Sequence, residues 1–277
     1  MSLEHIIAIT RPATLAEAFE QIVVGAVPIS GGTDVILRRR LGQVSLVDLT
    51  GLPLSGIAVG DDALVIGGTT TLTEILEHET AATMASGVLA TMLRQVGSPL
   101  LRNVATIGGH LARGRLSDVV PVLLALDASV HYHDGVDRSK ILEAFYAEGH
   151  NRHPLIVTGL SIPIPRPPSA SAFRKFSRTG FDLAILNAAC RLDTVDGKVS
   201  EARVVVGETP ALAARVPAAE AELIGTMLGP GAIERASSAA ATEIPAEDDE
   251  RGSADYRRAL AGVLVRRCLD EIEGILQ

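Results

Sequence analysis

The sequence contains little cysteine and few aromatic residues. It has two cysteines, no tryptophan, three tyrosines and five phenylalanines in 277 residues. An iron–sulfur cluster takes about four thiolates, so this chain cannot ligate one with cysteines of its own. Cys190 and Cys268 do not form a Cys-x-x-Cys pair, and we expect both to be buried free thiols. Any electron transfer by the chain therefore requires an organic cofactor.

Clustered positive charge is also scarce. The net charge is -8 and the isoelectric point is near 5.4, which argues against a nucleic-acid surface. We interpret the one basic run, Arg38 to Arg40, as the solvated end of a helix, with a phosphate or partner contact as the alternative. No apolar run reaches the ~20 residues of a membrane-spanning helix, and the N-terminus lacks signal-peptide features. We expect a soluble, cytoplasmic protein.

Several familiar functional motifs are missing. No Gly-x-Gly-x-x-Gly follows a strand and no P-loop motif occurs, so neither a Rossmann dinucleotide site nor a P-loop is predicted. His131 and His133 could begin a metal site, but without a third ligand we interpret them as surface histidines. The acidic run from Glu247 to Glu250 is interpreted as a solvated loop. The spacing of residues predicts no metal ligand and no catalytic acid–base pair.

Two glycine turns are the most informative feature that is present. The first is Ser30-Gly31-Gly32-Thr33-Asp34, and the second is Thr106-Ile107-Gly108-Gly109-His110. Adjacent glycines beside Ser or Thr leave backbone N–H groups bare, so several donors can converge on one anion. Two such turns brought together could hold a pyrophosphate, which predicts a dinucleotide site. We interpret a further pair, Gly67-Gly68, as a plain turn.

The first half of the chain alternates between strand-like and helical patterns. Thr14 and Glu17 have the spacing of a capping box that opens a helix. Asp118 is the expected N-cap residue of an apolar, buried helix. The segment from Gly97 to Asn103, which contains Pro99, should break the preceding helix and cross to the second glycine turn. The expected strands are 6–9, 26–30, 44–49, 57–59, 64–66, 128–133 and 154–162, and the expected helices are 15–22, 35–41, 71–77, 84–96 and 119–126.

The run from Pro163 to Pro168 contains four prolines, and we expect it to be an extended linker. After it come expected strands at 172–178, 184–192 and 198–206, then helices at 218–223, 232–241 and 253–275. The predicted fold class is α+β. The predicted domains are residues 1–165, with subdomains 1–52 and 53–165, and a C-terminal domain of residues 170–277 built on a three-stranded antiparallel sheet.

At the glycine turns the chain resembles the FAD-binding medium subunits of the molybdenum hydroxylases, the xanthine dehydrogenase and carbon monoxide dehydrogenase type. The likeness includes Arg102-Asn103-Val104-Ala105 before the second turn, Asp118 to Ala128, and Phe173-x-Lys175-x-x-Arg178. It extends over essentially the whole chain. The resemblance implies a small α/β subdomain, a larger mixed-sheet subdomain with FAD between them, and a C-terminal α+β domain.

The resemblance also implies roles for individual residues. The two turns would clasp the pyrophosphate, and Asp118 would hydrogen-bond the ribityl chain or nearby flavin atoms. Lys175, with Arg174 as the alternative, would offer positive charge toward the isoalloxazine ring. The cofactor-binding residues expected in this way are Ser30, Gly31, Gly32, Thr33, Asp34, Val35, Thr106, Ile107, Gly108, Gly109, His110, Asp118, Ile156, Val157 and Lys175.

The chain departs from the family pattern after the second turn. His110 stands where the family usually has Asn, and residues 113–117 replace an Asn-Ala-Ser-Pro-Ala segment. Arg113 and Arg115, which this segment introduces, could pair with phosphate or face a partner subunit.

By resemblance, the chain would be the FAD-carrying electron-transfer subunit of a heterotrimeric complex. Electrons would arrive from a [2Fe-2S] cluster on a small subunit, which receives them from a molybdopterin centre on a large subunit. FAD would pass them to NAD, a quinone or oxygen. One alternative is a flavin-free structural or assembly subunit, motivated by the replaced 110–117 segment. Another is a flavoenzyme that acts alone on a small substrate.

Overall fold

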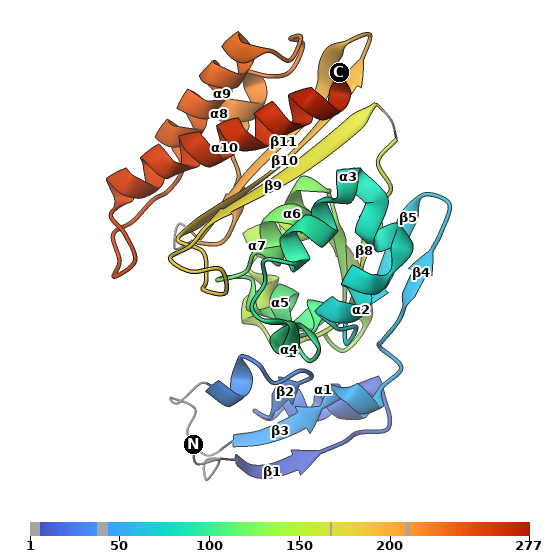
Figure 1. Ribbon diagram of the computed structural model, residues 1–277. Coiled ribbons are helices and arrows are strands. Elements are labelled where there is room, and N and C mark those ends of the chain that lie inside the picture. The colour runs from blue at the N-terminus through green and yellow to red at the C-terminus, as the bar shows by residue number, and fades with distance from the viewer. Residues whose placement is uncertain (1–5, 38–43, 167, 209–210) are drawn as a thin grey trace. The chain divides into compact units, whose positions relative to one another are not determined.

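The computed structural model describes residues 6–37, 44–166, 168–208 and 211–277. Packing divides the chain into two units, each built from three stretches (Figure 1). The first unit comprises Met1–Ile75, Ser98–Arg113 and Ser129–Ile162, and the second comprises Leu76–Gly97, Gly114–Ala128 and Pro163–Gln277. The predicted helix end at Arg38 to Arg40 lies outside the described residues.

The first unit begins with a small parallel sheet of strand order β1-β3-β2, formed by β1 (Ile6–Thr10), β2 (Val27–Ile29) and β3 (Val44–Asp48). Helix α1 (Leu15–Val23) packs on it, with Ala18 and Ile22 buried. The Thr14 N-cap of the expected capping box is confirmed, because the Glu17 N–H donates to Thr14 Oγ1 at 3.2 Å, while the Glu17 carboxylate accepts from the Ala13 N–H at 2.9 Å. Of the helix expected at 35–41, the described part is a 3-10 turn, η1 (Val35–Leu37). Another 3-10 turn, η2 (Leu49–Gly51), follows β3.

A five-stranded sheet of order β4-β5-β8-β6-β7 completes the first unit. The expected hairpin is confirmed as β4 (Ile57–Val59) and β5 (Ala63–Gly67), and β6 (Ser129–His133) and β8 (Ile156–Pro163) were also expected. The sequence did not indicate β7 (Asp137–Ile141), whose side chains are mostly exposed and polar. The remaining elements are α2 (Leu72–Glu77), α4 (Pro99–Arg102), α5 (Ile107–Arg113), α7 (Leu142–Ala147) and η3 (His150–Arg152).

Pro99 begins the short helix α4, which follows the expected break after the preceding helix. Its missing N–H is tolerated in the first turn of α4, where Ser98 Oγ accepts from the Leu101 N–H at 3.3 Å. The helix expected at 84–96 differs from the structure at its start. The helix α3 (Glu79–Leu93) has non-helical backbone from Met84 to Gly87, so its second part begins at Val88.

The second unit is built on an antiparallel sheet of order β12-β11-β10-β9. Its strands are β9 (Ser169–Phe176), β10 (Leu186–Val195), β11 (Lys198–Gly207) and the two-residue β12 (Ala214–Arg215), so the sheet has one strand more than expected. Helices α8 (Pro217–Ala221), α9 (Pro230–Glu243) and α10 (Ala254–Leu276) cover one face, and α3 and α6 (Val119–Ala125) cover the other (Figure 1). The α+β fold class is confirmed.

Strand β10 shows why two layers of helices are needed. Its residues from Leu186 to Leu192 are all buried, which requires cover on both faces. Alternate residues, including Ala188, Cys190 and Leu192, pack into the core with α10. The intervening Asn187 and Arg191 contact the ends of α6 instead. Cys190 and Cys268 are both buried and free, as expected.

The acidic run before α10 is a mostly exposed loop, as expected, and it also pairs with a buried arginine. Arg257 is 1% exposed and donates to Asp249 Oδ1 at 2.7 Å and to the Glu247 carbonyl at 2.6 Å. A buried guanidinium must be paired, so these contacts fix the run against the start of α10.

Candidate functional site

The two glycine turns meet in the first unit. A Cβ on Gly31 would lie 1.7 Å from the carbonyl oxygen of Val104, two residues before the second turn. Real Cβ atoms do not approach backbone so closely, hence only glycine fits here. The sequence-based expectation that the turns come together is consistent with this contact.

The first turn carries unused hydrogen-bond donors. Among the described residues, the backbone N–H groups of Gly31, Gly32 and Thr33 have no acceptor. The hydroxyl of Ser30 is buried and likewise has no partner within the described part of the chain. An unpaired buried hydroxyl is costly, roughly 1–3 kcal/mol, so a group of this kind usually has a ligand to bind. Four donors on four successive residues suit a phosphate.

The second turn differs from the expectation of bare donors, which was wrong for two of its residues. The Ile107 N–H donates to the Thr70 carbonyl at 3.0 Å, and the Gly108 N–H donates to the Gly68 carbonyl at 2.9 Å. The Gly109 N–H has a long contact of 3.4 Å with Thr106 Oγ1. Gly109 is therefore the residue of this turn whose N–H is least committed to the protein itself.

The Gly67-Gly68 pair is more than the plain turn we expected. The Gly68 N–H donates to the Thr158 carbonyl at 2.8 Å, while its own carbonyl accepts from Gly108. A Cβ on Gly68 would lie 2.3 Å from the Val157 carbonyl oxygen. Gly68 thus joins the second turn to β8, which carries Ile156 and Val157. A sequence signal for this role was present, because Gly67-Gly68, like Gly31-Gly32, comes at the end of a strand.

Three ionisable groups surround the junction of the turns. Arg113, the last residue of α5, pairs with Asp34 at 3.3 Å between Nη1 and Oδ1. Burial, and then the positive charge of Arg113, lower the pKa of His110 to about 4, and Asp34 opposes that shift. The imidazole of His110 is therefore neutral at pH 7 and can donate one hydrogen bond.

Two further expected site residues lie together in the second unit. Lys175 Nζ donates to Asp118 Oδ2 at 2.6 Å and to the Gln95 carbonyl at 2.9 Å, and Asn187 donates to Asp118 Oδ1 at 2.8 Å. Asp118 is the N-cap residue of α6, as expected, but its side chain makes no capping hydrogen bond to the helix. Burial raises the pKa of the Asp118 carboxyl, and the Lys175 ammonium opposes the rise. Asn187 had not been identified from the sequence.

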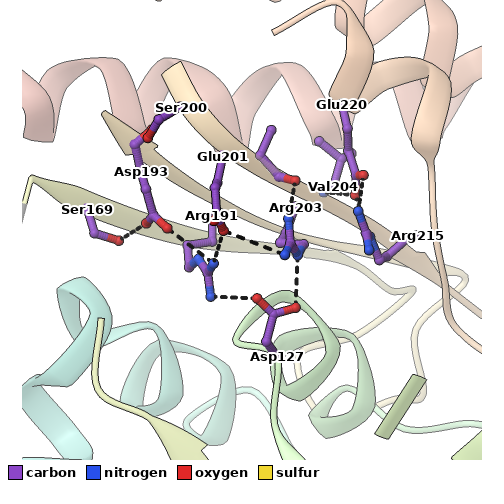
Figure 2. A network of polar contacts seen from close by, with 11 residues as sticks. Asp127, Ser169, Arg191, Asp193, Ser200, Glu201, Arg203, Val204, Arg215 and Glu220 are labelled. Carbon is purple, nitrogen blue, oxygen red and sulfur yellow. Dashed lines mark hydrogen bonds and ion pairs between the residues drawn. The ribbon is translucent and has the colours of Figure 1, made fainter. Parts of the chain in front are cut away.

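The other end of α6 is held by a second carboxylate, that of the partly exposed Asp127. Figure 2 shows Asp127 between two arginines of the sheet, Arg191 on β10 at 3.0 Å and Arg203 on β11 at 2.8 Å. Arg191 also pairs with Asp193 and Glu201, each at 3.2 Å. Asp118 and Asp127 therefore fasten α6 to the sheet at both ends, which fixes the position of the Asp118–Lys175 pair.

The described residues contain no group of three or more His, Cys, Asp or Glu side chains arranged to hold a metal ion. His133 Nδ1 instead lies 2.8 Å from Asp137 Oδ1, and its ring packs edge-on against Phe19. No helix in the described part of the chain is long and apolar enough to cross a membrane.

The comparisons with known proteins identify the chain's two halves. Residues 5–165 match the FAD binding domain in molybdopterin dehydrogenase, and residues 171–272 match the CO dehydrogenase flavoprotein C-terminal domain. The nicotine 6-hydroxylase medium subunit of Paenarthrobacter nicotinovorans is 32% identical over 250 residues, 88% of each chain. The carbon monoxide dehydrogenase medium chain of Afipia carboxidovorans is 29% identical over 275 residues, 94% of each.

A solved structure of a carbon monoxide dehydrogenase also contains a chain similar to this one. The crystal structure of Cu,Mo-CO dehydrogenase in its cyanide-inactivated form contains a chain with a TM-score of 0.89 and 26% identity, covering 97% of this chain and 98% of that one. The protein is thus an oxidoreductase subunit with an FAD-binding domain. It belongs to the FAD-binding medium subunits of the molybdenum hydroxylases.

The described residues fit that cofactor. FAD carries a pyrophosphate, and the first turn offers the buried, unpaired Ser30 hydroxyl with three unused N–H groups. Because Gly31 lies so close to Val104, a side chain does not fit at this position of the turn.

Proposed function

We propose that the chain holds FAD by its pyrophosphate at the first glycine turn and serves as the electron-transfer subunit of a molybdenum hydroxylase complex. The observation that carries this proposal is the set of unused donors at Ser30, Gly31, Gly32 and Thr33. When bound, FAD supplies the ability to exchange electrons one or two at a time. The protein's part is to bind and orient FAD and to tune the electrostatic environment of the flavin.

The second turn and β8 have supporting roles in this proposal. Gly109 and His110 add donors beside the first turn, while Ile107 and Gly108 hold the second turn in place through Thr70 and Gly68. Ile156 and Val157, both buried on β8, would form apolar surface for the flavin. Their proposed role is to exclude water from the ring.

The buried Asp118–Lys175 pair is proposed as the group that sets the electrostatic environment of the flavin. Lys175 is 3% exposed and Asp118 is 7% exposed, so their charges are little screened by solvent. Asn187 and the Gln95 carbonyl hold the pair in one geometry. A fixed cation near a flavin favours its reduced, more negative form.

We further propose two partner chains, a small subunit with a [2Fe-2S] cluster and a large subunit with molybdopterin. Relatives named medium chain, medium subunit and complex subunit support an assembly of several chains. The small subunit would deliver electrons, and NAD, a quinone or oxygen would accept them. We propose a cytoplasmic location for this assembly.

The first test is the near-ultraviolet and visible absorbance of the purified chain, followed by acid extraction of any chromophore. Equimolar FAD is the expected result. A colourless protein that also fails to bind added FAD would refute the proposal and favour a flavin-free assembly subunit. Co-expression with candidate small and large subunits then tests electron transfer, because substrate should reduce the flavin in the complex. Reduction by substrate of the isolated chain would instead indicate a flavoenzyme that acts alone.

A further inference from the structure

The proposed phosphate turn has an electrostatic problem. Asp34 directly follows Thr33, and its side chain is about one-third exposed, at 31%. A carboxylate beside a bound pyrophosphate repels it, and the repulsion is strongest where solvent is partly excluded. The donors at Ser30 to Thr33 therefore need a nearby cation if the turn is to hold an anion well.

Arg113 is placed to supply that cation. It ends α5, the helix that begins in the second glycine turn, and its Nη1 lies 3.3 Å from Asp34 Oδ1. This separation is longer than the roughly 2.7–2.9 Å of a tight charge-assisted bond. A guanidinium has five N–H donors, so Arg113 can remain beside Asp34 and still donate to a second acceptor. Its side chain is 29% exposed, hence within reach of a ligand.

Other basic residues of the same segment are less suited. His110 is neutral at pH 7, because burial and the charge of Arg113 lower its pKa to about 4. Arg115 is exposed, and no hydrogen bond or ion pair joins it to another described residue. Arg113, in contrast, pairs with the first turn through Asp34.

We propose that Arg113 offsets the charge of Asp34 and so makes the first glycine turn able to accept the pyrophosphate of FAD. This inference rests on the proposed function. It assigns a role to Arg113, which lies in the segment that departs from the family pattern. Arg113 and Asp34 together would contribute no net charge, which leaves the N–H groups and Ser30 to attract the phosphates. The position of Arg113 at the end of α5 sets its reach.

The test compares FAD affinities of the full-length chain, stripped of flavin, by flavin fluorescence. Arg113→Gln should weaken FAD binding roughly ten- to a hundredfold, the usual effect of losing one charged contact. Arg115→Gln is the matched control, with the same loss of charge two residues away, and should stay within about threefold of the wild type. Asp34→Asn should bind FAD more tightly than the wild type, and Asp34→Asn combined with Arg113→Gln should recover most of the lost affinity.

Several results would overturn the inference. Unchanged affinity in Arg113→Gln, an equal loss in Arg115→Gln, or no recovery in the double variant would each do so. Asp34→Asn keeps the test valid if Arg113→Gln fails to fold, since weaker binding by Asp34→Asn contradicts the proposed repulsion. A wild-type chain that does not bind FAD at all would instead refute the proposed function.

Discussion

Replacement of Ser30 by alanine should have opposite effects on the flavin-free and flavin-bound protein. The Ser30 hydroxyl is buried without a partner among the described residues. In the flavin-free protein, no hydrogen bond offsets the desolvation cost of this hydroxyl. Removing an unsatisfied buried hydroxyl should raise the free energy of unfolding of the flavin-free chain by about 1–3 kcal/mol. If the hydroxyl donates to a phosphate oxygen, Ser30→Ala should also weaken FAD binding roughly ten- to a hundredfold.

Ser171 provides a matched control for this experiment. Its hydroxyl is also buried without a partner in the described structure, but it lies on β9 in the second unit. Ser171→Ala should stabilise the chain by a similar amount, about 1–3 kcal/mol, and leave FAD affinity unchanged. The measurements are urea unfolding without flavin and titration with FAD. A flavin-free Ser30→Ala chain that is less stable than the wild type, or one with normal FAD affinity, would refute the reasoning.

Other substitutions test separate features. Gly31→Ala should abolish FAD binding and cost at least about 1–3 kcal/mol of stability, because its new methyl group collides with backbone. Wild-type stability should fall by up to about 3 kcal/mol as pH drops from 6.5 to 4, since His110 binds a proton more readily when unfolded, and His110→Asn should lose less. Asp127→Ala should lower the free energy of unfolding by about 1–3 kcal/mol, because it leaves the buried Arg191 with fewer partners.

These predictions have their own controls. Gly274→Ala tests the general effect of adding a methyl group, since a Cβ there meets nothing within 4 Å and alanine favours the helix. FAD titration and urea unfolding are the measurements for Gly31→Ala, and normal flavin binding would contradict the close approach to Val104. For His110, identical pH profiles of variant and wild type would show that another group titrates. For Asp127, an unchanged urea midpoint would mean that Arg191 is satisfied without it.

Local patterns in the sequence located the two glycine pairs, although the second pair lies in the first turn of α5. Each turn follows an apolar run, and the residues that need bare backbone are the glycines themselves. The capping box at Thr14 and the hairpin around residues 60–62 are likewise encoded by neighbours in the chain. The division into domains at about residue 165 stays a prediction, as do the roles of individual residues in binding FAD.

Long-range partners could not be predicted in the same way. Asp118 has the local appearance of an N-cap, but Lys175 and Asn187, 57 and 69 residues away, bind its carboxylate instead. The N–H groups of Ile107 and Gly108 appear bare until Gly68 and Thr70 are folded against them. In both cases a tertiary contact competes with the local one and prevails, because buried polar groups take whichever partner the packing provides.

The fastening of α6 bears on how the chain acquires its structure during synthesis. This helix lies within residues 5–165, the stretch that matches the FAD-binding family model, yet its two end carboxylates pair with residues 175–203. A ribosome that has made only the first 165 residues has therefore produced a helix whose two end carboxylates still lack their partners. The nascent chain should remain open around α6 until β11 emerges, because Arg203, one of the partners of Asp127, lies on that strand.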